Sequence, residues 1–481
     1  MQLPSGVMDT ADVVVVGAGP TGLMLACELA LAGVAVRVLE ERASAPNITR
    51  AFAVHARTLE LLDARGMAEA LVPRGVQVFE LAPPGGTTVD LRELPGRYAM
   101  LLIVPQSGTE HVLETRVGEL GVPVVRGAEV IGLTQDDGGV TVACADGTSI
   151  RAKYVVGCDG AHSTVRAQVG IDFAGKQYET HILLADVALA RAPSDTLTGV
   201  TNERGVVLMI PFGDGWFRAI AWDRLREQAP LTEPVTLDEI RDSFVRIAGE
   251  DYGMTEMRWS SRFLSERRQA RHYRSGRVFI AGDAAHVHSP LGGQGMNTGI
   301  GDAMNLGWKL AAAVNGSAPT WLLDTYEAER HPVGAAVLRT TDAFNQVVLG
   351  RSKVQRIART IVIGTLTRVP KTRRLMREFL SGIGIAYPRK RGDHALVGRR
   401  MPDVDCSGER VYELLRAGKF VLITATPVDT GRSDLVHVVG RHPELSAAVL
   451  VRPDSYVAWA DERVPSAAEC VAAVDNWMHQ K

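Results

Sequence analysis

The chain has 481 residues, of which 46% are hydrophobic and 22% charged, and its formal net charge is −2. This is the composition of a soluble globular protein of two or three domains, and so weak a net charge argues against a nucleic-acid partner. No segment approaches the ~20 apolar residues that span a bilayer, and residues 1–9 lack the pattern of a signal peptide, so no membrane partner is expected. The five cysteines are scattered, without a Cys-x-x-Cys pair or zinc-ligand spacing, which predicts a reduced, cytoplasmic protein with no disulfide framework and no metal site.

The amino-terminal segment has the pattern of a βαβ unit. Residues 12–16 form a β-branched run, residues 23–32 have helical composition, and residues 34–39 form a second strand-like run. The strands of such a unit are parallel and joined by a right-handed crossover. Strands and helices continue to alternate to about residue 170.

A glycine loop, with Gly17, Gly19 and Gly22, joins the first strand to the first helix. Glycine allows the tight turn and a close approach of the backbone to a pyrophosphate, and the helix amino terminus offers N–H groups to that anion. Glu40 ends the second strand 18 residues after Gly22, where a carboxylate accepts hydrogen bonds from ribose hydroxyls. The combination favours a dinucleotide site over a tight turn without a ligand, and it does not distinguish FAD from NAD.

The pattern changes beyond residue 170. Short alternating runs between residues 171 and 259, such as 206–211 and 216–222, predict an antiparallel sheet. A strand at 277–281 and a long helix over 297–314 follow, and helical composition persists to about residue 385. The tail has short strand-like runs and a final helix, which predicts a compact α/β unit.

A second motif follows the strand predicted at 154–157. The strand ends in Asp159-Gly160, and a helix begins near Ser163 and Thr164. A capping role for the aspartate or the serine explains this pattern as well as a ligand does.

The third motif follows the strand at 277–281. It brings Gly282 and Asp283 to the carboxyl end of that strand, and a glycine-rich loop over 289–297 then leads into the long helix. Asp283 can accept a hydrogen bond from a ribityl hydroxyl, and the amides of residues 293–297 can point at an isoalloxazine edge. A helix amino terminus there stabilises negative charge on a reduced flavin.

In this order the three motifs resemble the class A flavoprotein monooxygenases, the family of para-hydroxybenzoate hydroxylase, and most closely the bacterial polyketide hydroxylases and rifampicin monooxygenases. The similarity covers residues 12–332, including the motifs at 302–310 and 326–332, and the tail resembles a thioredoxin-like domain without its Cys-x-x-Cys. The resemblance implies an α/β fold: a Rossmann-like FAD-binding domain, an interleaved antiparallel-sheet substrate domain and a C-terminal thioredoxin-like domain. The predicted bounds of these domains are 9–170 with 271–385, 171–270, and 395–481.

The resemblance also implies the residues that bind FAD. They are Gly17, Gly19, Pro20, Thr21, Gly22, Glu40, Glu41, Arg50, Gln106, Val130, Asp159, Thr164, Gly282, Asp283, Pro290, Leu291, Gly293, Gly295, Met296 and Asn297. Arg50, at the pyrophosphate or gating the flavin, and Pro290, beside the oxygen-reaction site, are the expected catalytic residues. Glu41 departs from the family pattern, in which a basic residue often follows the ribose-binding acid.

The chemistry implied by the resemblance is oxygenation of an aromatic substrate. Transiently bound NADPH or NADH reduces FAD, O2 then gives a C4a-hydroperoxide, and an electron-rich aromatic carbon attacks the terminal oxygen. The site must exclude water, and a base that forms a substrate phenolate would speed attack. Candidates for that base are His55, His286 and His288, each of which also fits a structural role.

A substrate pocket is expected between the FAD-binding domain and the middle sheet. Possible lining residues, each of which fits ordinary sheet core equally well, are Val206, Met209, Phe212, Trp216 and Trp222. The apolar side chains and the resemblance suggest a bulky polyketide-like aromatic compound. Two alternatives stay open, a Baeyer–Villiger or ring-opening monooxygenase of a polyketide or an ansamycin such as rifampicin, and a non-catalytic flavin-binding protein. The chain is expected to be a monomer or a homodimer.

Overall fold

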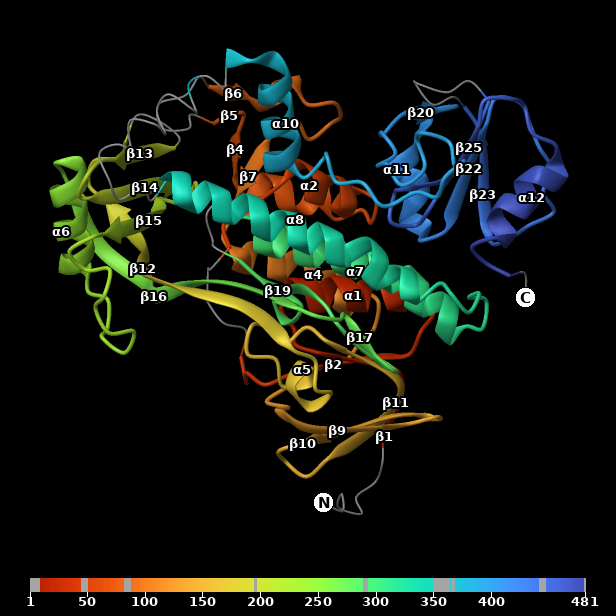
Figure 1. The fold of residues 1–481 in the computed structure, drawn as a ribbon, viewed down its shortest axis with the longest axis horizontal. Coiled ribbons are helices and arrows are strands. Elements are labelled where there is room, and N and C mark those ends of the chain that lie inside the picture. Colours follow the sequence, from red (N-terminus) through yellow and green to blue (C-terminus); the bar gives the residue numbers. More distant parts are fainter. Residues whose placement is uncertain are drawn as a thin grey trace.

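The computed structural model describes residues 9–44, 51–81, 88–193, 197–288, 293–348, 364, 368–440 and 447–479. Helices α7 and α8 cross the middle of the molecule, between a six-stranded sheet at the left and the C-terminal domain at the right (Figure 1). Among the described residues, no helix is both long enough and apolar enough to cross a membrane.

An eight-stranded sheet carries the glycine loop. Its main path runs β17-β18-β11-β1-β2-β8, with β9 and β10 attached beside β11. The five strands β18, β11, β1, β2 and β8 are parallel, and the buried run Val13–Val16 explains why β1 lies at the centre. The strands are β1 (Asp9–Val16), β2 (Val36–Glu40), β8 (Val124–Arg126), β9 (Val130–Asp136), β10 (Gly139–Cys144), β11 (Ser149–Gly157), β17 (Arg274–Ser275) and β18 (Val278–Ile280).

Helices cover this sheet, and α1 packs along α7. The helix predicted to begin at residue 297 begins three residues earlier, because Gly293 takes the left-handed conformation at its N-cap. The helices are α1 (Pro20–Leu31), α2 (Ala56–Asp63), α3 (Ala68–Leu71), α4 (Gln106–Glu119), α5 (Thr164–Gln168), α7 (Gln294–Val314), α8 (Asp324–Val348) and α10 (Pro370–Ser381). Short strands beside them are β3 (Ala53–Val54), β4 (Val76–Val78), β5 (Glu80–Leu81), β6 (Val89–Asp90) and β7 (Leu101–Ile103).

The middle sheet has six strands in the order β13-β14-β15-β12-β16-β19, all paired antiparallel. Its last strand belongs to the third motif, so the sheet is attached directly to the FAD-binding part. Helix α6 (Leu237–Ala248) covers one face, capped by the Thr236 side chain at its start and by Gly249 at φ 90° at its end. The strands are β12 (Phe173–Leu189), β13 (Thr198–Thr201), β14 (Gly205–Pro211), β15 (Trp216–Asp223), β16 (Met254–Ala270) and β19 (His286–Val287).

The C-terminal domain has a four-stranded sheet in the order β23-β22-β24-β25. The β22–β23 pair is parallel and the other two pairs are antiparallel. This arrangement agrees with the thioredoxin-like expectation. The elements are β20 (Asp405–Cys406), β21 (Glu409–Arg410), α11 (Val411–Leu414), β22 (Phe420–Thr424), β23 (Leu435–Val439), β24 (Ala448–Val451), β25 (Val457–Asp461) and α12 (Ala467–Asp475).

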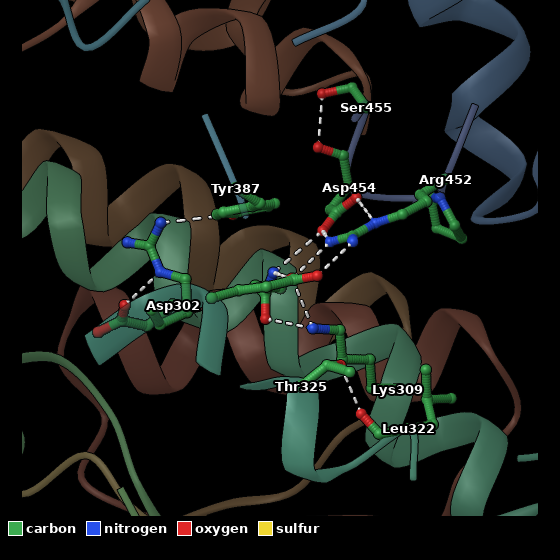
Figure 2. A network of polar contacts seen from close by, with 12 residues as sticks. Asp302, Lys309, Leu322, Thr325, Tyr387, Arg452, Asp454 and Ser455 are labelled. Carbon is green, nitrogen blue, oxygen red and sulfur yellow. Dashed lines mark hydrogen bonds and ion pairs between the residues drawn. The ribbon is translucent and has the colours of Figure 1, made fainter. Parts of the chain in front are cut away.

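A buried network of charged side chains joins the C-terminal domain to α7 and α8 (Figure 2). Glu329 on α8 accepts from the two guanidinium NH groups of Arg452 at 2.7 and 2.9 Å and from the ammonium of Lys309 at 2.7 Å. Arg452 also pairs with Asp454, with its Nε 3.0 Å from the carboxylate. Burial lowers the pKa of Lys309 to about 8, although Glu329 opposes that shift. Burial raises the pKa of Glu329, but Arg452 and Lys309 lower it by more, so the carboxylate stays ionised.

Candidate flavin and substrate site

The glycine loop has one glycine that protein packing does not require. Gly17 has φ 102°, and a Cβ there would lie 2.4 Å from the Cys158 carbonyl oxygen; a Cβ at Gly22 would lie 2.0 Å from the Gly17 oxygen. Gly19 has an extended backbone, and a Cβ there would meet no atom of the described residues within 4 Å. An anion held close to the backbone explains glycine at this position. Because Gly19 offers no side-chain cap, the first N–H groups of α1 are available to such an anion, and the loop therefore fits the pyrophosphate of FAD.

Glu40 lies at the end of β2, 3% exposed, beside this loop. One carboxylate oxygen accepts from the Ala18 N–H at 2.8 Å, and the other accepts from the Arg42 N–H at 3.1 Å and its Nε at 2.6 Å. Burial raises the pKa of Glu40, but the bonds from Arg42 and Ala18 lower it on balance. The carboxylate is therefore ionised where a ribose is expected. Arg42 was not among the residues predicted for the site, although a cation two positions after Glu40 was a usable signal. The predicted FAD residue Glu41 is solvent-exposed.

The Asp159 carboxylate makes local bonds. It accepts from the Ser163 hydroxyl at 2.5 Å and the Val165 N–H at 3.0 Å, and Ser163 caps α5 by accepting from Arg166 N–H at 3.0 Å. Burial raises the pKa of Asp159, and these bonds lower it by less. Asp159 and Ser163 therefore do have the capping role at the start of α5 that the sequence pattern allowed. The guanidinium of Arg166 also donates to the Ala284 carbonyl at 2.9 Å, which ties this motif to the third one.

The third motif is held by a buried carboxylate on α7. Asp302, 0% exposed, accepts from the Gly282 N–H at 3.0 Å and from Nε of Arg330 at 2.7 Å, and it bonds Nε2 of His286 at 2.6 Å. Burial raises the pKa of Asp302, but Arg330 and His286 lower it by more. Asp283, by contrast, is exposed and free to meet a ligand hydroxyl. The family resemblance includes the motif at 302–310, but it does not by itself predict that Asp302 holds the turn at Gly282.

The amino terminus of α7 is tied to β3 by Asn297. Its side chain accepts from the His55 N–H at 2.9 Å and donates to the carbonyls of Ala53 at 2.9 Å and Gly293 at 2.7 Å. A Cβ at Gly295 would lie 3.7 Å from a carboxylate oxygen of Asp283. The loop that carries Asp283 and the start of α7 therefore lie side by side, where the flavin ring is expected.

The remaining predicted FAD residues fall into three groups. Gln106, at the start of α4, accepts from the Ala51 N–H at 3.1 Å and donates to Glu110 at 2.8 Å, and Val130 starts β9 with 6% exposure. Pro20 and Thr21 open α1, Thr164 opens α5, and Met296 lies partly exposed in the first turn of α7. Arg50, Pro290 and Leu291 lie outside the described residues.

The histidines considered as bases differ in exposure. His286 is 0% exposed and bonded to Asp302, so it is a structural residue and not a base that meets substrate. His55 is 1% exposed at the start of α2. His288 is partly exposed beside the third motif.

The middle sheet presents an apolar face to the FAD-binding part. Ile210, Phe212 and Ile220 cluster there with Ala53 and Ile103. Among the predicted substrate residues, Phe212 and Trp216 belong to this cluster, and Val206 and Trp222, paired across β14 and β15, form a small cluster of their own.

Met209 lies on the opposite face of the sheet. It is 1% exposed and packs with Phe244 and Ile247 of α6. The prediction that it lines the substrate pocket is therefore wrong. The physical reason is strand alternation: Val206 and Met209 are three positions apart on β14, so their side chains point to opposite faces of the sheet.

A buried ion pair stiffens the apolar face. Arg218, 0% exposed, donates from Nε to Asp186 at 2.6 Å, and its guanidinium lies 4.9 Å from the ring centre of Trp259 and 5.4 Å from that of Phe212. Burial lowers the pKa of Arg218, while Asp186 raises it by less. The aromatic rings are therefore packed around a fixed cation.

The fold and the three loops define a dinucleotide-binding flavoprotein oxidoreductase. Two family models match the chain, the FAD binding domain over residues 10–341 and the C-terminal region of aromatic-ring hydroxylases over residues 394–480. The chain therefore belongs to the FAD-binding monooxygenase family, and it is an FAD-dependent monooxygenase. The predicted family, cofactor and fold class are confirmed.

Relatives match the chain along almost its whole length. It is 41% identical over 459 residues to a rifampicin monooxygenase of Streptomyces venezuelae, which covers 94% of this chain and 96% of the relative. The structure of the anhydrotetracycline hydroxylase OxyS from Streptomyces rimosus superposes with a TM-score of 0.85 at 37% identity, covering 98% and 99% of the two chains. The Diels-Alderase PyrE3 of the pyrroindomycin pathway superposes with a TM-score of 0.84 at 34% identity, covering 98% and 100%.

Proposed function

We propose that the chain uses FAD, NAD(P)H and O2 to hydroxylate a bulky, flat aromatic substrate of polyketide type. The observation that carries this proposal is the position of Ala53. Its carbonyl accepts from Asn297 at the start of α7, and its side chain belongs to the apolar cluster that contains Phe212. The expected flavin end and the aromatic face of the sheet therefore meet at one strand.

Bound FAD supplies the redox chemistry, since it accepts electrons from NAD(P)H and, when reduced, activates O2. In the proposed arrangement the amides that follow Gly19 bind the pyrophosphate, Glu40 binds a ribose, and Asp283 binds a ribityl hydroxyl. The amino terminus of α7 places positive dipole charge at the flavin edge. NAD(P)H is expected to dock transiently, because the sequence has no second Gly-x-Gly-x-x-Gly.

The sheet provides the substrate surface in this proposal. Phe212 and Trp216 supply an apolar aromatic face, which suits a flat ring system and keeps water from the reacting atoms. The relatives named after rifampicin and anhydrotetracycline act on bulky compounds, which supports a substrate of comparable size.

The experiment measures oxygen transfer directly. Protein loaded with FAD is given NADPH or NADH, isotopically labelled O2 and a panel of anthraquinones, tetracyclic precursors and ansamycins. We expect an aromatic ligand to stimulate NAD(P)H oxidation and one labelled oxygen atom to appear on an aromatic carbon, seen by mass spectrometry and NMR.

Other outcomes identify the alternatives. Labelled oxygen inserted into a ring bond would indicate Baeyer–Villiger or ring-opening chemistry. A ligand that is converted without NAD(P)H and without label would indicate a non-oxidative reaction, as the name of PyrE3 describes for that neighbour. Protein that cannot be loaded with FAD would contradict the proposal altogether.

A cytoplasmic location is also expected. All five cysteines are free thiols, as is usual in a reducing compartment.

Gel filtration with light scattering distinguishes the monomer from the homodimer, the two oligomeric states expected for this chain.

A further inference from the structure

The turn at residues 452–456 of the C-terminal domain lies against the FAD-binding domain. Arg452 and Asp454 belong to the network around Glu329, and Ser455 and Tyr456 are 0% and 3% exposed. Ser455 has a left-handed backbone, φ 61°, which directs this tight turn. Two chains of contacts lead from the turn to the two loops where the flavin ring is expected.

The first chain of contacts runs through Arg57 on α2. Its guanidinium donates to the Ser455 hydroxyl at 2.8 Å and to the Asp454 carbonyl at 3.2 Å, and it lies 4.8 Å from the ring centre of Tyr456. Arg57 is only two residues after His55, whose N–H donates to Asn297. The C-terminal domain thereby holds the start of α2, which is bonded to the start of α7.

The second chain of contacts runs through Arg330 on α8. The rings of Tyr456 and Tyr387 pack against each other with centres 4.1 Å apart and planes tilted by 30°, and Arg330 donates to the Tyr387 hydroxyl at 3.4 Å. Arg330 also donates to Asp302 at 2.7 Å, and Asp302 accepts from the Gly282 N–H; Asp302 and Tyr387 are labelled in Figure 2. This chain ends in the turn that carries Asp283.

The space between the two chains of contacts is too small for a ligand of its own. The cavity there has a volume of about 20 Å³ and is lined by Arg57, Asn297, Arg330, Tyr387 and Asp454, among others. That volume holds about one water molecule. The side chains therefore act on the flavin loops through direct contacts.

We propose that residues 452–456 position both flavin loops, so that the C-terminal domain sets the geometry in which FAD is held. Arg57 and Arg330 are the positioning residues that transmit this constraint, one to the start of α7 and the other to the turn at Gly282. Buried hydrogen bonds to charged groups are strong and directional, so they transmit position rather than merely adding stability. This role rests on the proposed position of FAD.

The test uses Ser455→Ala, which removes one of the acceptors of Arg57 in the turn, and Tyr387→Phe, which removes the hydroxyl bonded to Arg330. Each variant is expected to weaken FAD binding ~3–10-fold, since part of a hydrogen bond to a charged group is lost. Each should also alter the visible spectrum of bound FAD and, with the aromatic ligand that stimulates NAD(P)H oxidation present, increase the share of that oxidation that yields peroxide. FAD titration, absorbance spectra and a peroxide assay on the full-length protein measure these effects.

Arg410→Lys provides the matched control. Arg410 bonds Asp63 at the far end of α2, 2.8 Å away, so the variant weakens the same domain interface away from the flavin loops. We expect a lower thermal midpoint with unchanged FAD affinity and spectrum. Equal flavin effects in Arg410→Lys, or none in Ser455→Ala and Tyr387→Phe, would overturn the proposal. Failure of the unmodified protein to bind FAD would instead refute the proposed function.

Discussion

The side chain of Thr21 occupies the space that a side chain at Gly282 would need. A Cβ at Gly282 would lie 2.6 Å from the Thr21 hydroxyl oxygen, and a Cβ at Gly299 on α7 would lie 2.2 Å from it. The first glycine loop therefore interlocks with the third motif, 261 positions later in the chain. This contact fixes the two ends of the proposed FAD site relative to each other.

Gly299→Ala should destabilise the protein by ~1–3 kcal/mol, because the added methyl group overpacks against Thr21. Thr21→Ala in the same chain should recover most of that loss, because it removes the clashing hydroxyl. Urea unfolding of the single and double variants measures the coupling. Gly118→Ala, at an exposed position of α4 with no described atom within 4 Å of the new Cβ, is the helical control and should not destabilise. Simple additivity of the two changes would contradict the interlock.

Glu40→Gln should weaken FAD binding ~10–100-fold, because a hydrogen bond to a charged group is worth about 1.5–3 kcal/mol. The loss follows from the ionised carboxylate that the structure places beside the loop. Glu41→Gln, its exposed neighbour, should leave the affinity unchanged. FAD titration followed by fluorescence measures both, and a reversed order would mean that Glu41 holds the ribose.

Trp216→Leu should raise the KM for an aromatic substrate ~2–10-fold, because lost ring contacts cost about 0.5–1.5 kcal/mol. Phe217→Leu, the next residue on the opposite face, should lower the thermal midpoint and leave KM alone. Steady-state kinetics and thermal unfolding of both variants provide the comparison. An equal change of KM in both variants would argue that the apolar face of the sheet that contains Trp216 is not the substrate surface.

Glu329→Gln should destabilise the protein by ~3–5 kcal/mol at neutral pH, because Lys309 and Arg452 stay buried and lose the carboxylate that they share, which leaves Arg452 with Asp454 alone. The depressed pKa of Glu329 means that its contribution is complete above the unfolded pKa of about 4.5 and is lost as the pH falls below it. The stability of the unmodified protein should therefore fall more steeply with acid than that of the variant. Unfolding by urea between pH 6 and pH 3, roughly the range set by these values, measures the difference.

Lys309→Met should change stability far less than Glu329→Gln, because Glu329 keeps both bonds from Arg452. The pKa of Lys309 is lowered to about 8 in the folded protein. Above that pH the unfolded chain holds a proton that the folded chain has released, so stability rises with pH until the unfolded lysine also titrates, at about 10.4. The variant should lack this rise, and a parallel pH profile would show that Lys309 is not the titrating group.

Local patterns were enough to predict the glycine loop, its strands and the tail. Alternation along β14 also indicates that Val206 and Met209 lie on opposite faces of the sheet, so the two side chains do not line the same pocket. Alternation does not predict which face of the middle sheet meets the FAD-binding domain, because that depends on α6 covering the other face.

The sequence by itself determined the βαβ unit, the positions of Glu40 and Asp283 at strand ends, and the cofactor class, because these depend on short-range backbone geometry and spacing. Only the tertiary structure decided the partners of the buried charges. Arg57 and Ser455 are 398 positions apart, and Arg330 is linked to Gly282 through Asp302. Such pairs form where two packed surfaces exclude water, and no periodicity along the chain specifies which surfaces meet.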